Sequence, residues 1–122
     1  MNSERLDLVI VDDSDVIVKR LRTILADVER VNCVGTATNY DEAINMVKAL
    51  HPKVVLLDIN LGGKNGIEVL REIKTNYKST IVIMLTNFSG SYYRDTCKQL
   101  GAEYFLDKSS EFENIPEILK AL

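Results

Sequence analysis

Five polar side chains each follow a short apolar run in the sequence. The acidic pair Asp12 and Asp13 follows residues 6–11, Asp58 follows residues 54–57, Thr86 follows residues 80–85, and Lys108 comes shortly after residues 103–106. They comprise three carboxylates, one hydroxyl and one ammonium group. Gathered in one place, such groups could hold a hard divalent cation and accept a phosphoryl group.

The three carboxylates require a neutralising cation if they lie close together. Like charges at short range drive one of the acids toward protonation unless an opposite charge is near. Mg²⁺ prefers oxygen ligands, takes one or two protein carboxylates and retains several waters. We therefore expect Asp13 and Asp58 to bind Mg²⁺ directly, Asp12 to bind it through a water, and the backbone carbonyl of Asn60 to add a ligand.

Asp58 is the candidate phosphoacceptor. A carboxylate beside Mg²⁺ and a lysine can attack phosphorus, since the metal and the ammonium of Lys108 neutralise charge on the transferred group. The hydroxyl of Thr86 can donate to a phosphoryl oxygen. Each residue also has an ordinary structural role, with Asp13 as a helix cap, Thr86 and Asp58 as turn residues, and Lys108 as a surface charge. Their joint occurrence at four strand ends favours a functional site.

The elements that must position these side chains alternate between strand and helix. The unbroken apolar run of residues 54–57 is typical of a strand buried on both faces. Strands are expected at residues 6–11, 31–37, 54–57, 80–85 and 103–106, and helices after each of them. This alternation predicts an α/β fold, a doubly wound parallel sheet with helices on both faces. Ligands of such sheets bind outside the carboxyl ends of the strands, where the five polar side chains fall.

Local signals place the helix ends. Ser14 or Asp13 can cap the first helix. Asn39, with Glu42 three residues later, predicts a capping box for the second helix. The third helix is expected at residues 67–76, the fourth at residues 89–100 with Gly101 as its left-handed stop, and the fifth from between residues 112 and 116.

Composition limits the function classes. The 122 residues are expected to form one domain, 1–122, and the net charge of −3 without a basic block argues against direct nucleic-acid binding. No signal peptide or long apolar segment is found, so no membrane partner is expected. Cys33 and Cys97 lack metal-binding spacing and are interpreted as free core thiols of a cytoplasmic protein.

With these motifs the chain resembles the receiver domain of two-component response regulators over essentially its whole length. The matching residues are Asp12 and Asp13, residues 54–58 with the distal Gly66, Thr86, and Lys108. The resemblance implies a flavodoxin-like five-stranded parallel sheet of order 2-1-3-4-5 with five helices. It also implies a signalling module rather than an enzyme. Asp58 would then be phosphorylated, with Mg²⁺, by a sensor histidine kinase or a histidine phosphotransfer protein, and would lose the phosphoryl group by slow self-catalysed hydrolysis.

The resemblance further implies a conformational switch. Thr86 would be drawn toward the phosphoryl group while Phe105, three residues before the lysine, changes rotamer. The surface made by the fourth helix, fifth strand and fifth helix would change as a result. Its implied partners are a downstream protein or a fused output domain, and a phosphorylation-dependent homodimer is a further outcome.

The sequence departs from the family pattern at four positions. Ser109 replaces a proline that commonly follows a cis bond, and a cis bond before a non-proline residue costs about 2.5–4 kcal/mol, so the turn is either rebuilt in trans or strained. Gly62 replaces another proline and should make its loop more mobile. Asn87 is larger than the usual residue and should alter access to the acyl phosphate. Phe105 replaces a frequent tyrosine and must act by packing alone.

Three other functions are compatible with an α/β fold of this size. An aspartyl-nucleophile phosphatase of the haloacid dehalogenase-like group needs a second aspartate two residues after the nucleophile, where this chain has Asn60. Flavodoxin-like flavin binding needs a phosphate-cradling loop where Asp12 and Asp13 would repel phosphate. A pseudo-receiver that only docks partners remains an alternative, because Ser109 could disable the site.

Overall fold

The computed structural model describes residues 5–122, and residues 1–4 of the expected domain lie outside the described residues. The chain alternates between strand and helix. The strands are β1 (Leu6–Val11), β2 (Val31–Ala37), β3 (Val54–Leu57), β4 (Ile81–Thr86) and β5 (Tyr104–Asp107). The helices are α1 (Asp15–Leu25), α2 (Tyr40–Leu50), α3 (Gly66–Asn76), α4 (Ser91–Gln99) and α5 (Ile115–Ala121), the last preceded by a 3₁₀ turn, η1 (Phe112–Asn114).

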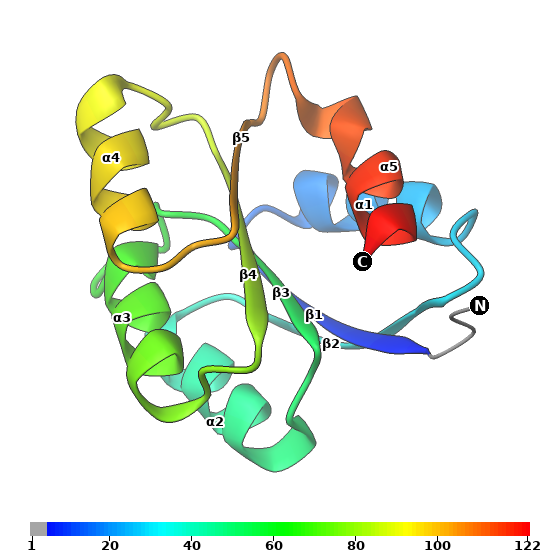
Figure 1. Cartoon of the computed structure of the whole chain (residues 1–122), viewed down its shortest axis with the longest axis horizontal. Helices are drawn as coiled ribbons and strands as arrows, with labels where there is room; N and C mark the ends of the chain where they lie inside the picture. The colour runs from blue at the N-terminus through cyan, green and yellow to red at the C-terminus, as the bar shows by residue number, and fades with distance from the viewer. Residues whose placement is uncertain (1–4) are drawn as a thin grey trace.

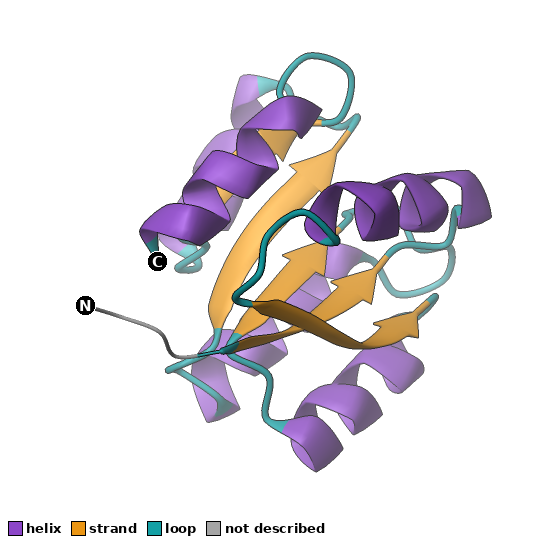
Figure 2. Cartoon of the chain, turned by 90° about the vertical axis from the view of Figure 1, so that its right-hand side faces the viewer, coloured by secondary structure: helices purple, strands orange, loops and turns teal. Residues whose placement is uncertain are grey.

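The five strands form one parallel sheet in the order β2-β1-β3-β4-β5. All strand arrows therefore point toward one edge of the sheet (Figure 2). The register brings Val11 beside both Ala37 and Leu57. Backbone bonds continue this register, since the Asp58 amide donates to the Val11 carbonyl at 3.0 Å. The predicted flavodoxin-like fold is confirmed, and Asp12 and Asp58 leave the sheet side by side.

Two apolar layers fix the sheet between the helices. Helices α2, α3 and α4 cover one face, and α1 and α5 cover the other (Figure 1). Strand β3 contributes Val55 and Leu57 to the first layer and Val54 and Leu56 to the second. All four are at most 1% exposed, and burying each such side chain stabilises the fold by about 1.5–3 kcal/mol. Burial on both faces explains the unbroken apolar run before Asp58.

Side-chain caps set the starts of the helices, with one correction. Ser14 caps α1 by accepting from the Ile17 amide at 3.3 Å. Asn39 caps α2 by accepting from the Glu42 amide at 2.9 Å. The expected capping box is wrong in its second half. The Glu42 carboxylate accepts from the amide and hydroxyl of Thr38, at 2.8 and 2.9 Å, one residue earlier than a capping box requires.

Several element boundaries differ from expectation. Strand β4 starts at Ile81 rather than residue 80, because the Thr80 amide donates to the Tyr77 carbonyl at 3.0 Å in the preceding turn, and the strand includes Thr86. Helix α4 is shorter than residues 89–100. Gly101 adopts the expected left-handed backbone, with φ of 104°. Pro116 lies in the first turn of α5, where its missing amide breaks no bond.

The two cysteines differ in burial. Both thiols are free. Cys97 is buried in the core, and Cys33 is half-buried and packs against the apolar layer under α1 and α5. Burial raises the pKa of the Cys97 thiol to about 11, which makes it a poor nucleophile. Within residues 5–122, none of the helices has the length and apolarity needed to cross a bilayer.

Candidate phosphoacceptor site

Lys108 joins two buried carboxylates at the carboxyl edge of the sheet. Its Nζ atom lies 2.7 Å from Oδ2 of Asp12 and 2.8 Å from Oδ2 of Asp58. Lys108 is 9% exposed, Asp12 3% and Asp58 6%, so water screens the ion pairs weakly. One ammonium thus neutralises charge on two acids that come from β1 and β3.

Backbone amides orient the remaining oxygens of both acids. Oδ1 of Asp12 accepts from the Ser14 amide at 2.9 Å, and Oδ1 of Asp58 accepts from the Asn60 amide at 3.3 Å. Each carboxylate therefore has one oxygen on Lys108 and one on the loop that follows its own strand. This arrangement fixes the direction of the Asp58 carboxylate.

Burial and pairing shift the pKa values in the site. Burial raises the pKa of the Asp12 carboxyl, and the bonds from Lys108 and Ser14 offset only part of that effect. Burial lowers the pKa of Lys108, but the hydrogen bonds and charges of Asp12 and Asp58 together outweigh it, so the pKa is raised. Lys108 is therefore a full cation at neutral pH.

The third carboxylate gives the site the donor set of a hard cation. Oxygens of Asp12, Asp13 and Asp58 lie within 4.8 Å of one another, and Asp13 is exposed where the other two are buried. The charge count is three carboxylates against one ammonium, which leaves a surplus of negative charge. Closely spaced carboxylate oxygens that open to solvent suit Mg²⁺, which keeps part of its water shell.

A cavity of about 220 Å³ opens beside these acids. Residues from four loops line it: Asp13, Asp58, Asn60, Thr86, Asn87, Phe88 and Lys108. Thr86 is buried, and its hydroxyl accepts from the Phe88 amide at 3.1 Å. Every residue predicted for metal binding or phosphoryl transfer except Asp12 lines this cavity, and Asp12 contacts it through Lys108.

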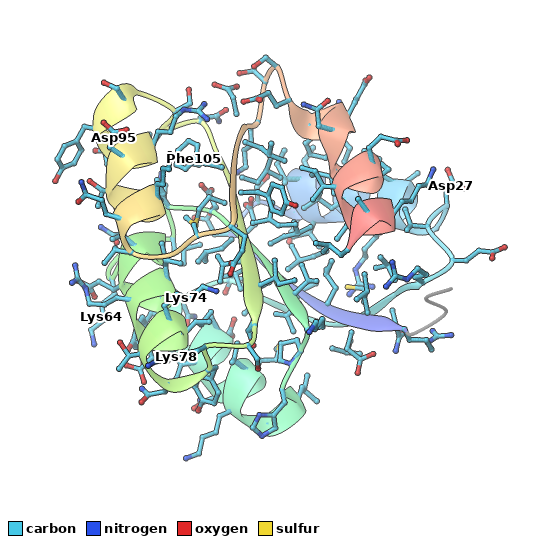
Figure 3. The ribbon with its side chains drawn as sticks, viewed as in Figure 1. Asp27, Lys64, Lys74, Lys78, Asp95 and Phe105 are labelled. Carbon is cyan, nitrogen blue, oxygen red and sulfur yellow. The ribbon has the colours of Figure 1, made fainter. Side chains whose placement is uncertain are left out.

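Phe105, the predicted switch residue, lies away from the cavity. It is half-buried on β5 and lies on the side facing α4 (Figure 3). The Arg94 guanidinium of α4 lies over the Phe105 ring, 4.7 Å from its centre, and donates to the Phe105 carbonyl at 3.2 Å. Any movement of Phe105 therefore has to disturb its contact with α4.

Gly66 lets the first turn of α3 approach the loop after Asp58. A Cβ atom at this position would lie 1.9 Å from the Asp58 carbonyl oxygen and 2.9 Å from Cα of Ile59. The Gly66 amide donates to the Ile59 carbonyl at 2.7 Å. In the loop between Asp58 and Gly66, Gly62 and Gly63 adopt left-handed φ values of 66° and 50°, which glycine accepts without strain.

The turn after Lys108 shows how the chain accommodates Ser109 in place of a proline. All peptide bonds of the described residues are trans, so the turn is rebuilt in trans. Asp107 organises it, because its Oδ1 accepts from both the amide and the hydroxyl of Ser109 at 2.7 Å. Sequence reasoning assigned no role to Asp107. The available signal was an aspartate two residues before a serine, which is typical of an Asx turn.

Comparisons with known proteins agree with this geometry. The family model "Response regulator receiver domain" matches residues 8–120. The transcriptional regulatory protein LnrK of Bacillus subtilis is 32% identical over 110 residues, which cover 90% of this chain and 50% of LnrK. The chain spans between 31% and 56% of the length of the first curated relatives it matches.

Solved structures are similar over nearly the whole chain. A chain of the CheX-CheY-BeF3-Mg²⁺ complex from Borrelia burgdorferi is 28% identical with a TM-score of 0.88, and the match covers 97% of this chain and 89% of that one. The isolated REC domain of RcsB from Salmonella enterica serovar Typhimurium, in the presence of phosphomimetic BeF3⁻, is 25% identical with a TM-score of 0.90, over 97% and 88% of the two chains. The chain belongs to the receiver domain family of two-component response regulators.

Proposed function

We propose that this receiver domain is a phosphoacceptor signalling module, in which Asp58 accepts a phosphoryl group from a sensor histidine kinase or a histidine phosphotransfer protein. One observation carries the proposal. The Asp58 carboxylate lines the cavity, 2.8 Å from the Lys108 ammonium and beside the oxygens of Asp12 and Asp13. No structural role requires three acids and a lysine to gather at one sheet edge.

In the proposed reaction an Asp58 carboxylate oxygen forms a bond to phosphorus. The bond from phosphorus to the donor breaks at the same centre, and the donor atom keeps its electron pair: a histidine nitrogen, or an acetate oxygen when acetyl phosphate is used. Lys108 neutralises charge on the phosphoryl oxygens, and the Thr86 hydroxyl donates to one of them. The product is an acyl phosphate on Asp58.

The donor set fits Mg²⁺ as the cofactor. Asp13, Asp58 and the carbonyl of Asn60 would hold the ion directly, and Asp12 would hold it through a water. When bound, Mg²⁺ supplies positive charge that offsets the charge of the incoming phosphoryl oxygens. The similarity to a chain of the Borrelia complex, whose name includes both BeF3 and Mg²⁺, supports this assignment.

The proposed signal passes through Thr86 and Phe105. When Thr86 turns toward a phosphoryl oxygen, its bond from the Phe88 amide, now 3.1 Å long, has to change. Movement of the loop and of Phe105 would then alter the surface of α4, β5 and α5. That surface would be read by a downstream protein or a fused output domain, or by a second copy in a phosphorylation-dependent homodimer. We place this signalling in the cytoplasm.

Incubation with acetyl phosphate and Mg²⁺, followed by intact mass measurement, tests the proposal. The wild type and the exposed control Asp95→Asn should each gain the mass of one phosphoryl group, and Asp58→Asn should gain none. No gain in the wild type at any Mg²⁺ concentration would favour a docking module instead. Rapid turnover of phosphomonoesters would point to a phosphatase.

A further inference from the structure

We propose that Asp107 is a positioning residue for phosphoryl transfer, acting by holding the loop that carries Lys108. This inference rests on the proposed phosphorylation of Asp58. Asp107 is the last residue of β5 and does not line the cavity. Its effect must therefore pass through the residues that it holds.

The Asp107 carboxylate clamps the backbone on the far side of Lys108. Its Oδ1 atom accepts from the Ser109 amide and hydroxyl, both at 2.7 Å, and from the Ser110 amide at 3.2 Å. These three donors come from the two residues that follow Lys108. The backbone that carries Lys108 is thus fixed immediately after the point where its side chain leaves it.

A second set of bonds closes the same loop. The Asp107 amide donates to Oε1 of Glu111 at 3.1 Å, and the Glu111 amide donates back to the Asp107 carbonyl at 2.9 Å. The Lys108 amide donates to the Thr86 carbonyl at 3.0 Å. The loop is held at both ends, so the only freedom left to Lys108 lies in its side chain.

Hydrogen bonding by Ser89 and then by Ser109 lowers the pKa of Asp107, so the carboxylate that accepts from Ser109 and Ser110 is ionised at neutral pH. The bond from the Lys108 amide to the Thr86 carbonyl joins this loop to the end of β4. The loop that Asp107 holds therefore lies directly beside the loop that presents Thr86 and Phe88 to the cavity.

This anchoring matters because the Lys108 side chain is long and flexible. Its ammonium has to meet Asp12 and Asp58 together, at 2.7 and 2.8 Å. A displacement of about 1 Å in a catalytic group can slow a reaction by about 100-fold. Releasing the loop should therefore slow phosphorylation of Asp58, and the loss should depend on the presence of Lys108.

A double-mutant cycle measures that dependence. The rate of phosphorylation by saturating acetyl phosphate, and the donor concentration at half this rate, are measured for the wild type, Asp107→Ala, Lys108→Ala and the double variant. We expect the saturated rate to fall about 10-fold in Asp107→Ala and about 100-fold in Lys108→Ala. The double variant should be no slower than Lys108→Ala alone.

Two further variants separate geometry from charge. Asp107→Asn keeps an oxygen that can accept from the Ser109 and Ser110 amides, so its rate should return to within about 3-fold of the wild type. Asp27→Ala removes an exposed acid on the side of the molecule away from α4 and should leave the rate unchanged (Figure 3).

The outcomes are distinct. If Asp107→Ala slows the reaction equally with and without Lys108, the inference is overturned. It is also overturned if the wild type is phosphorylated and Asp107→Ala reacts at the same rate. A wild type that gains no phosphoryl group overturns the proposed function itself. If Asp107→Ala fails to fold in a thermal unfolding assay, Ser109→Ala replaces it in the cycle. A slowing of about 3-fold that vanishes with Lys108→Ala then supports the inference, and its absence overturns it.

Discussion

Lys108 and Asp58 lie 50 residues apart in the chain and meet in a buried ion pair with an Nζ to Oδ2 distance of 2.8 Å. The same ammonium also holds Asp12, so one positive charge serves two acids. With Asp13 beside them, the cluster carries more negative than positive charge. From this imbalance we expect an added divalent cation to change the stability of the fold.

Mg²⁺ should therefore stabilise the protein through Asp13. A ligand at about ten times its dissociation constant adds about 1.4 kcal/mol to the free energy of unfolding. Asp13→Asn should be more stable than the wild type in EDTA, because like-charge repulsion falls, and should gain less from Mg²⁺. Urea unfolding with and without Mg²⁺ measures both effects, with Asp95→Asn as the control. An undiminished Mg²⁺ response in Asp13→Asn would contradict the metal assignment.

The Thr86 hydroxyl should contribute to stability as well as to the proposed switch. Thr86→Ala leaves the Phe88 amide without its 3.1 Å acceptor and should lower the free energy of unfolding by about 1 kcal/mol relative to Thr86→Ser, which keeps the hydroxyl. Urea unfolding of the two variants gives the difference. Equal stabilities would mean that this bond holds the loop weakly.

Gly66 should tolerate no side chain, because a Cβ atom would lie 1.9 Å from the Asp58 carbonyl oxygen. Gly66→Ala should lose about 2–3 kcal/mol of unfolding free energy, since the backbone of the Asp58 loop has to shift. Gly90→Ala is the matched control, because nothing lies within 4 Å of the added Cβ, and should change stability by less than about 0.5 kcal/mol. Similar losses in both variants would refute the close-approach argument.

Much of the fold was accessible from the sequence because patterns and packing agree. The run before Asp58 is apolar throughout since β3 is covered on both faces, and this burial identified the central strand. The expectation that polar residues follow parallel strands at one edge then brought Asp12, Asp58 and Lys108 together. Strand order itself came from the family resemblance rather than from the pattern.

Contacts between distant loops could not be predicted in the same way. Thr80 has strong strand propensity, but its amide donates to the Tyr77 carbonyl in the preceding turn, and its hydroxyl donates to the Pro52 carbonyl 28 residues earlier. The Glu42 carboxylate accepts from the Thr38 amide rather than from the Asn39 amide one residue later, and the conformation of the loop decides between the two. The bond from the Asp107 amide to the Glu111 carboxylate likewise depends on the conformation of the loop between them, which no local pattern specifies.

Asp107 gives a prediction for acid pH. Hydrogen bonds from Ser89 and Ser109 hold its pKa below the ordinary value of 3.8. A carboxyl with a lowered folded pKa contributes stability that is present above the unfolded pKa and is lost as pH falls through the folded pKa. The gap in melting temperature between the wild type and Asp107→Asn should hold constant from about pH 5 to pH 8 and narrow below about pH 3.8. A gap that widens toward low pH would contradict a stabilising role of the ionised Asp107 carboxylate.

Direct mapping of the phosphoryl group tests whether Asp58 is the phosphoacceptor. After reaction with acetyl phosphate and Mg²⁺, borohydride reduces an acyl phosphate to an alcohol, so the modified aspartate is recovered as homoserine in a peptide digest. We predict homoserine at position 58 and an unmodified Asp12 and Asp13. Homoserine at position 12 or 13, or none in the digest, would contradict this prediction.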